Sequence, residues 1–242
     1  MINILSLYWD LTELYGSRAN LLSIERDLKE SGVEYCVDKK TLGDELDFNR
    51  YDLIIMGCAS EKSLMKIRED IMRYKHELLL FVEGGGFILA LGNTMLLLLE
   101  SIEFNGETYP CLAIEKGKAS LSDKKRYTSN AIYRRADTYT DVVGYINKSH
   151  EVEDIEHPLF YVRYGIGDNK KSKEAGFYFR NVYGVDIVDP VLVKNPLFRR
   201  EILSKLLEVK GIDATLVEDE LWEEEMLAYK GALDELLELK KK

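Results

Sequence analysis

The sequence predicts an α/β fold, a flavodoxin-like three-layer sandwich with a mainly parallel central sheet and an antiparallel extension in its C-terminal half. Two patterns support this prediction. In the first half, short apolar runs alternate with segments of helical periodicity, as in βαβ units with right-handed crossovers. In the second half, short β-type segments follow one another with little helix between them, which is typical of antiparallel strands.

The first half should contain five strands and three helices. The expected strands span residues 2–7, 33–37, 52–57, 78–82 and 87–91. The run at 52–57 is almost wholly apolar, which indicates a strand buried on both faces. Helices are expected at 19–31, 61–74 and 93–100, where apolar residues recur at helical spacing. Gly32 follows the first of these helices, in the position where glycine commonly ends one.

The second half should hold five short strands and two closing helices. The expected strands span 131–135, 142–146, 160–164, 177–182 and 185–188, and the helices span 196–209 and 218–239. Asn195 can cap the first of these helices, and Pro196 fits its first position. Because no repeat, low-complexity linker or domain boundary is visible, residues 1–242 are expected to form one domain with a helical tail at about 216–240.

Composition excludes several classes of function. The net charge is −10, whereas a broad nucleic-acid groove needs a basic surface. The three cysteines are widely spaced and the three histidines lack acidic or cysteine neighbours at ligand spacing, so neither a metal site nor a cofactor is expected. The first residues lack a basic signal-peptide region, and the longest apolar run is too short to cross a bilayer. We therefore expect a soluble, cytoplasmic protein.

Residues 84–94 have the layout of a nucleophile elbow. A glycine-rich turn and an apolar strand lead to a second sharp turn and a helix, an arrangement that lifts a nucleophile toward substrate. The apex of that second turn is Gly92, which has no side chain. Thr94 lies two positions further, inside the expected helix, with no base near it in the sequence.

Two other segments follow strands and face the expected crevice at the carboxyl ends of the sheet. Residues 7–20 join the first strand to the first helix. Residues 56–60 follow the third strand, and Gly57 there would let backbone amides approach a ligand. Cys58 has two interpretations, as a reactive thiolate near a helix start or as a small buried core residue.

Several motifs in one order resemble class I glutamine amidotransferases of the cobyric acid synthase type, and most closely the glutaminase subunits of lipid II isoglutaminyl synthases. Residues 7–20 resemble the family's opening Leu-Tyr-x-Asp-x-x-x-Leu-Tyr-Gly-Asp-x-x-Asn, and residues 164–169 resemble its Tyr-Gly-x-Gly-Asn-Asn. Residues 144–147 look like a degenerate Gly-Phe-Glu-Asn, and 194–196 like the segment after the catalytic histidine. The resemblance runs nearly end to end.

The departures from the family pattern bear on catalysis. Where the family has Leu-Ala-x-Cys-x-Gly, residues 89–94 read Leu-Ala-Leu-Gly-Asn-Thr, so Gly92 replaces the nucleophile. Where it has Gly-Thr-Tyr-Leu-His-Gly-Pro, residues 184–190 read Gly-Val-Asp-Ile-Val-Asp-Pro, so Val188 replaces the histidine. Glutamine hydrolysis of this type needs a thiolate and an imidazole, and losing triad members costs about a million-fold in a model protease.

The resemblance therefore implies a catalytically degenerate homologue that works as a binding or regulatory subunit in peptidoglycan synthesis. Its expected partner is a Mur ligase-like subunit, with a homo-oligomer as the alternative. If the ancestral pocket persists, a small amino-acid-like ligand would lie near Asp10 and Arg126, the latter resembling an arginine that holds glutamine in the family, with Gly57 and Asn93 beside it. Otherwise Phe87 and the Gly92 region would fill the pocket.

Two rival interpretations remain. In the first, the chain is an active glutaminase that supplies ammonia through a displaced nucleophile, Cys58, with Asp186, Asp189 or His150 as base. In the second, it is an unrelated structural α/β protein without a pocket. The distances around Gly92 and Cys58 distinguish these alternatives.

Overall fold

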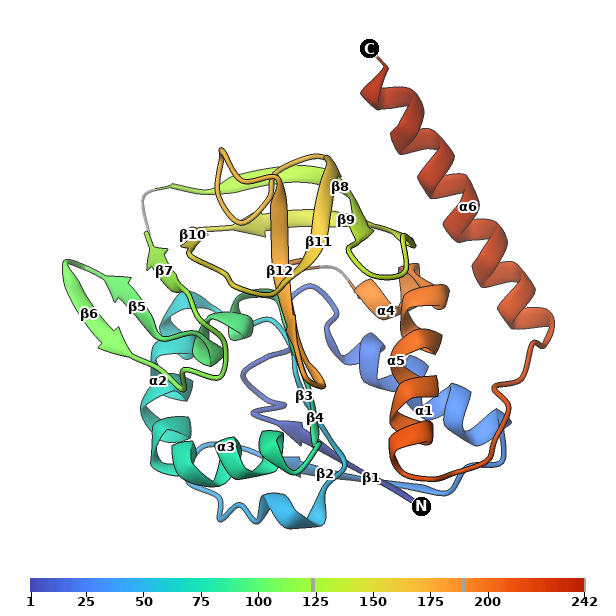
Figure 1. Ribbon diagram of the computed structural model, residues 1–242, viewed down its shortest axis with the longest axis horizontal. Helices are drawn as coiled ribbons and strands as arrows, with labels where there is room; N and C mark the ends of the chain where they lie inside the picture. Colours follow the sequence, from blue (N-terminus) through green and yellow to red (C-terminus); the bar gives the residue numbers. More distant parts are fainter. Residues whose placement is uncertain (123–124, 189, 242) are drawn as a thin grey trace.

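A nine-stranded sheet runs through the molecule, and it is parallel on one side and antiparallel on the other (Figure 1). The computed structural model describes residues 1–122, 125–188 and 190–241. The sheet order is β2-β1-β3-β4-β13-β12-β11-β8-β9. All pairs from β2 to β13 are parallel, and all pairs from β13 to β9 are antiparallel. The predicted fold class, including its antiparallel extension, is confirmed.

The strands of this sheet are β1 (Ile2–Leu7), β2 (Tyr35–Lys40), β3 (Leu53–Met56), β4 (Phe87–Leu91), β8 (Tyr127–Arg135), β9 (Asp141–Lys148), β11 (Pro158–Tyr164), β12 (Glu174–Phe179) and β13 (Val182–Val185). The helices are α1 (Arg18–Glu30), α2 (Glu61–Ile71), α3 (Lys75–Glu83), α4 (Val191–Lys194), α5 (Pro196–Val209) and α6 (Glu220–Lys240), with short 3₁₀ segments η1 (Phe48–Arg50), η2 (Met72–Tyr74) and η3 (Gly92–Leu98).

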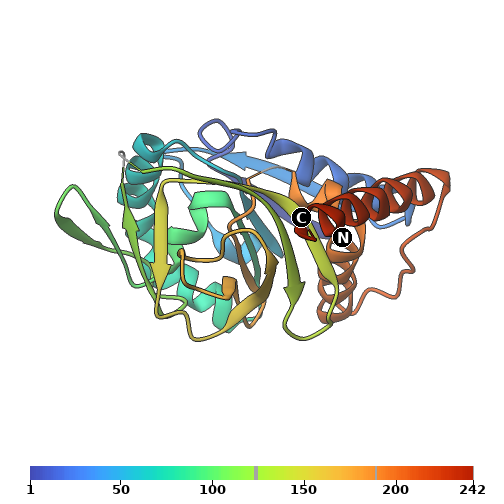
Figure 2. The same cartoon turned by 90° about the horizontal axis from the view of Figure 1, so that it is seen from above.

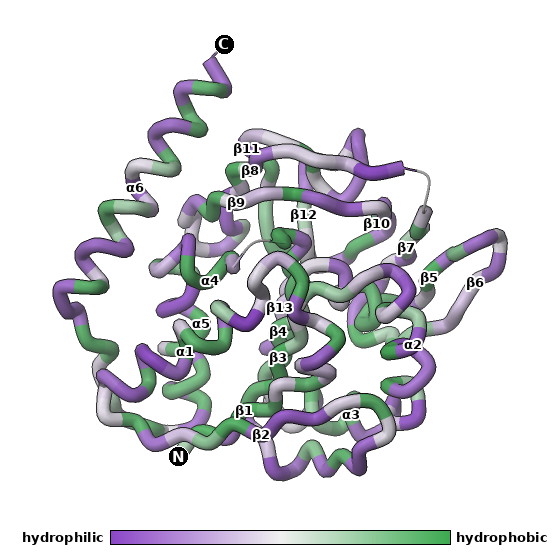
Figure 3. Tube along the Cα trace, turned by 180° about the vertical axis from the view of Figure 1, so that it is seen from behind, coloured by the Kyte–Doolittle hydropathy of each residue, from purple (hydrophilic) through white to green (hydrophobic). Residues whose placement is uncertain are grey.

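Apolar side chains on the two faces of the parallel strands form two separate cores. On one face, alternate residues of β1, β3 and β4 pack against α1, α4 and α5. On the other face, the intervening residues pack against α2, α3 and η3. Figure 2 shows helices on both sides of the sheet, and Figure 3 shows hydrophobic residues gathered along its central strands. This double covering explains why these strands read as apolar runs.

A second sheet of four short strands was not predicted from the sequence. It has the order β10-β7-β5-β6 and comprises β5 (Ser101–Phe104), β6 (Glu107–Pro110), β7 (Lys118–Leu121) and β10 (His150–Glu153). Each strand has only four residues, too few for a clear alternation. One signal was present, because Asn105 and Gly106 join β5 to β6 with positive φ at both positions, which is a common hairpin turn.

Three expected elements are wrong in kind or position. Residues 78–82 were expected to form a strand but belong to α3, where Leu78 and Val82 are buried one turn apart and Leu80 is exposed. A short apolar run does not by itself distinguish strand from helix. Residues 93–100 were expected to be an α-helix, but the chain forms the 3₁₀ segment η3. The strand expected at 185–188 is β13, which ends at Val185.

The tail helix α6 stands beside the antiparallel strands and extends past the body of the molecule (Figure 1). A buried ion cluster ties its first turns to the body, because the Arg199 guanidinium lies 2.7 Å from Asp27 and 2.6 Å from Glu225. No helix within the described residues is long and apolar enough to cross a membrane.

Candidate functional site

The loop after β3 and the turn after β4 meet at the carboxyl end of the sheet, and their contact defines the candidate site. Gly92 keeps the left-handed backbone of an elbow, with a φ of +68°. A Cβ atom at this position would lie 2.8 Å from both Cβ and Sγ of Cys58. The side chain of Cys58 therefore occupies the space into which a nucleophile at position 92 would project.

The backbone amides of the β3 loop are already used within the protein. The Cys58 N–H donates to Ser17 Oγ at 3.0 Å, and the Ala59 N–H donates to Asn93 Oδ1 at 2.9 Å. Asn93 also donates from Nδ2 to the Ala59 carbonyl at 2.7 Å, so its amide closes the loop with a pair of bonds. An oxyanion hole needs such donors to point at the developing charge. Neither amide is available for this purpose.

Ser17 was not predicted to belong to the site, although a signal existed. In the family motif that residues 7–20 resemble, aspartate stands at this position. The Ser17 hydroxyl donates to the Leu14 carbonyl at 2.8 Å while accepting the Cys58 N–H, and the Leu14 N–H bonds to the Cys58 carbonyl at 3.2 Å. The β1–α1 loop thus holds the Cys58 backbone from both sides.

Cys58 has the properties of a buried core thiol. Its exposed fraction is 4%, and burial raises its pKa to about 12. Its sulfur lies 3.6 Å from Asn93 Oδ1, and a hydrogen bond with the Asn93 backbone lowers the Cys58 pKa by less than burial raises it. Since the thiolate is the nucleophilic species, the raised pKa opposes a catalytic function for this thiol at neutral pH. The core interpretation of Cys58 agrees with this environment.

A charged cluster lies beside Val188, the position at which the resemblance places a histidine. Val188 itself is buried, and its N–H donates to the Tyr145 carbonyl. Asp186, two residues earlier, accepts from Lys148 Nζ at 2.7 Å and lies 3.1 Å from His150 Nε2. Burial alone would raise the pKa of Asp186, but the charges and hydrogen bonds of His150 and Lys148 outweigh it, and the pKa falls to about 2. Asp186 is therefore ionised at neutral pH.

His150 brings an imidazole to this place from a different part of the chain. Because ionised Asp186 can only accept, His150 Nε2 carries the shared proton. The other ring nitrogen, Nδ1, is buried and has no hydrogen-bond partner among the described residues. His150 and Cys58 line the same cavity. The sequence offered Cys58 as a displaced nucleophile and Asp186, Asp189 or His150 as its base. The structure places His150 at the cavity that Cys58 lines, with Asp186 bonded to it, and Asp189 lies outside the described residues.

This shared cavity is too small for an amino acid. Its volume is about 30 Å³, and it is lined by Cys58, Asn93, Arg126, His150 and Val188 with their neighbours. Typical small-molecule pockets measure about 300–1,000 Å³. Phe87, one of the residues expected to fill the pocket, begins β4 and lies at the end of the strand away from Gly92. The space next to the Gly92 Cα atom is filled by the Cys58 side chain.

The remaining predicted ligand residues are dispersed. Arg126 lines the cavity, but its guanidinium pairs with Glu61 at 2.6 Å and donates to Asn147 at 2.9 Å. Asp10 is not among the residues that line the cavity, and its carboxylate accepts from Thr41 at 2.5 Å. The expected pairing of Asp10 with Arg126 around one ligand is therefore not present.

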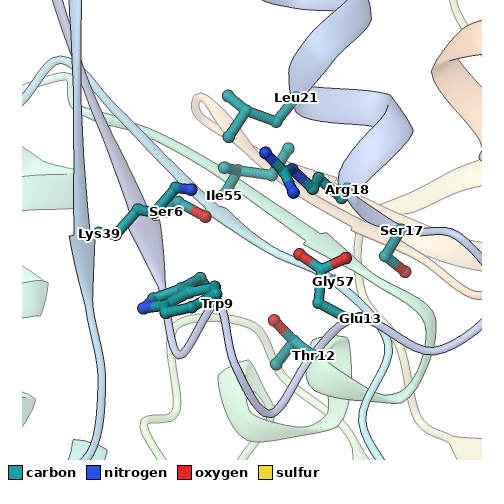
Figure 4. A pocket seen from close by; sticks show the side chains of 10 residues that line it. All are labelled: Ser6, Trp9, Thr12, Glu13, Ser17, Arg18, Leu21, Lys39, Ile55 and Gly57. Atoms are coloured by element: carbon teal, nitrogen blue, oxygen red, sulfur yellow. The ribbon is translucent and has the colours of Figure 1, made fainter.

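Gly57 borders a second small hollow, of about 20 Å³, at the carboxyl ends of β1 and β3 (Figure 4). Arg18 and Glu13 flank it, with Trp9 at one end. A Cβ at Gly57 would lie 2.2 Å from the Thr12 carbonyl oxygen, so glycine is needed here for loop packing.

Across the described residues, no group of three His, Cys, Asp or Glu side chains could hold a metal ion.

Comparison with known proteins adds two relatives that match most of the chain. The chain is 26% identical over 212 residues to subunit GatD of lipid II isoglutaminyl synthase (glutamine-hydrolyzing) from Streptococcus pneumoniae, covering 86% of this chain and 82% of that protein. It is 24% identical over 205 residues to the GatD subunit from Staphylococcus aureus, covering 84% and 83%. No family model matches. The two matches confirm the predicted resemblance to this glutaminase subunit.

A solved structure was also found. A glutamine amidotransferase from Thermotoga maritima superposes with a TM-score of 0.46 and 10% identity, covering 99% of this chain and 94% of that one. This likeness is too loose to carry an argument about the site.

Proposed function

We propose that this chain, a homologue of GatD subunits, is a catalytically degenerate glutamine amidotransferase-like protein that acts as a binding or regulatory subunit in lipid II modification. One observation carries the proposal: Cys58 fills the space above Gly92, where the nucleophile of a glutaminase would stand. Its expected partner is a Mur ligase-like subunit in the cytoplasm, since the relatives are themselves subunits of a synthase.

Four features around Gly92 and Val188 support the loss of glutamine hydrolysis. Gly92 supplies no sulfur and Val188 supplies no imidazole. The loop amides that would stabilise an oxyanion bond to Ser17 and Asn93 instead. The cavity of about 30 Å³ leaves no room for a glutamine side chain. The absence of a substrate space and the absence of a nucleophile are consistent with each other, because a nucleophile acts only on a bound substrate.

Measuring ammonia released from glutamine by the purified chain tests the proposal. The S. pneumoniae GatD subunit, assayed with its own synthase partner, serves as the positive control. We expect release at the background rate, both from the chain alone and after addition of a Mur ligase-like protein from the same source. Release well above background that Cys58→Ala abolishes would refute it.

The function as a subunit needs a separate test. We expect the chain to co-elute in size exclusion with a Mur ligase-like protein co-expressed from the same source. A homo-oligomer is the alternative, and multi-angle light scattering distinguishes the two. Recovery as a monomer in the presence of that partner would count against a subunit function, whatever the ammonia assay shows.

A second candidate function rests on the orphan nitrogen of His150. In this alternative, Nδ1 takes the Cys58 proton while Asp186 orients the ring, and the thiolate attacks the amide carbon of glutamine. Ammonia leaves with that proton, and water then hydrolyses the thioester. The buried position of Cys58 and its raised pKa oppose this alternative. Ammonia release lost in both Cys58→Ala and His150→Gln would favour it over the degenerate subunit.

A further inference from the structure

A large open groove lies between the tail helix α6 and the antiparallel edge of the sheet, far larger than the cavity beside Gly92. Its volume is about 540 Å³, within the range of specific binding pockets. Val143 and Tyr145 of β9 and Val193 of α4 form its floor. Figure 1 shows α6 beside the antiparallel strands, with its C-terminal end projecting past them.

The sequence of α6 carries two adjacent stripes. The first packs against the body along most of the helix, whereas the second contacts the body through Glu225 and Ala232. Trp222, Met226, Tyr229, Leu233 and Leu236 recur at alternating four- and three-residue spacing, and this stripe packs toward the body. The second stripe repeats the same spacing with the residues Glu225, Ala228, Ala232, Glu235 and Leu239. All five members of the second stripe line the groove.

The second stripe suits close approach of another helix. Such spacing gives a continuous seam along one side of a helix, and alanines allow a neighbouring backbone to come near. The stripe spans residues 225–239, about 21 Å of helix at ~1.5 Å per residue. A partner helix of about 15 residues would cover it.

The floor of the groove excludes an added β-strand. The outer edge of β9 is already closed, because Val143 N–H donates to Asn195 Oδ1 and Asn195 Nδ2 donates back to the Val143 carbonyl, both at 2.8 Å. The Tyr145 carbonyl accepts from Val188 N–H. Strand addition needs free backbone groups at an edge. Packing through side chains, as a helix does, remains available.

The negative charge of α6 favours a partner helix that carries basic residues. α6 carries seven acidic residues and two lysines, a net of −5. Two of these acidic residues, Glu225 and Glu235, line the groove, and Lys194 of α4 lines it as well. Glu225 is bound by Arg199 and Arg26, whereas Glu235 is exposed and forms no ion pair within the part of the chain that the structure describes. We propose that the groove between α6 and β9 binds an amphipathic, lysine- or arginine-bearing α-helix of a partner protein. The proposal does not depend on catalysis at Gly92, since an active enzyme could carry the same groove.

A designed helical peptide tests this on the full chain. The probe is a fluorescein-labelled peptide of about 15 residues with leucine and alanine on one face and lysines along the rim, followed by fluorescence anisotropy. We expect saturable micromolar binding. Ala232→Trp fills the groove and should weaken binding at least ten-fold, and Glu235→Lys should weaken it several-fold by charge.

The controls distinguish binding in the groove from nonspecific binding of the peptide. Leu227→Trp places the same aromatic ring on the solvent face of α6, where Leu227 is 74% exposed, and should leave binding unchanged. Circular dichroism verifies that each variant folds, and Glu235→Lys changes an exposed residue that folding does not need. Absent binding, equal binding to Ala232→Trp, or equal binding of a peptide with glutamate in place of lysine would overturn the proposal. A concentration-dependent dimer that Ala232→Trp abolishes would assign the groove to a second copy and also overturn it.

Discussion

Cys58 and Gly92 share one space: a Cβ atom on Gly92 would lie 2.8 Å from the Cys58 sulfur. The two residues are 34 positions apart in the sequence, yet each permits the other. The glycine leaves room for the thiol, and the thiol prevents any side chain at the elbow apex. The glycine at position 92 is therefore tied by packing to the cysteine at position 58.

This mutual fit predicts the effect of Gly92→Ala on stability. A left-handed φ costs an alanine about 1 kcal/mol, and the contact with Cys58 adds about 1–3 kcal/mol of overpacking. Urea unfolding should therefore show a free energy of unfolding lowered by the sum of these two costs. Gly211→Ala is the matched control, because Gly211 has a φ of +63° and open space around its Cβ position. Cys58→Gly should restore part of the loss at position 92; a purely additive double variant would contradict the shared space.

Thiol alkylation at neutral pH should distinguish the three cysteines. Cys36 is exposed, whereas burial raises the pKa of both Cys58 and Cys111. With iodoacetamide, we expect rapid labelling of Cys36 alone and labelling of the other two only when the chain unfolds. Peptide mass spectrometry reads the sites. Fast labelling of Cys58 in the folded chain would show an activated thiolate and support the displaced-nucleophile alternative.

Asp186→Asn should be strongly destabilising. Removing the carboxylate leaves Lys148 buried without a counter-charge, a loss of about 3–5 kcal/mol. Glu218→Gln is the control, since its ion pair with Arg200 is 70% exposed on the glutamate side and is worth at most about 1 kcal/mol. Because the folded pKa of Asp186 is about 2, below its ordinary value of 3.8, its contribution is present above pH 3.8 and lost as pH falls toward 2. Equal losses in both variants would show that the buried pair has no special weight.

Asp168→Asn should stabilise the protein at alkaline pH. Burial raises the pKa of Asp168 from 3.8 to about 7, more than Lys148 lowers it, so the folded state retains this proton. Stability from this group is complete below pH 3.8 and declines as pH rises through 7. Asparagine keeps an acceptor for the Gly176 N–H without the charge. At pH 8 the variant should be more stable by roughly 2–4 kcal/mol, with the difference vanishing near pH 4; a constant difference would place the cause elsewhere.

The fold was largely predictable because its parallel half is regular. Its buried strands give apolar runs, and the helices α1, α2 and α5 show clear periodicity. The four-stranded sheet was missed because its strands are short and its members are distant in sequence, as with His150 pairing with Leu121. For the site, the sequence named residues but not their contacts: Arg126 and Asn93 line the cavity and Gly57 lies in the adjoining loop, whereas Asp10 does not line the cavity.

By itself, the sequence determined the α/β architecture and placed Gly92 and Val188 where the family that it resembles has cysteine and histidine. The tertiary structure alone decided what surrounds these two positions: Cys58 against Gly92, Asn93 and Ser17 on the loop amides, and His150 with Asp186 beside Val188. The reason is physical. Local periodicity follows from the chain's own neighbours, whereas the filling of a cavity depends on side chains that packing brings together from distant segments.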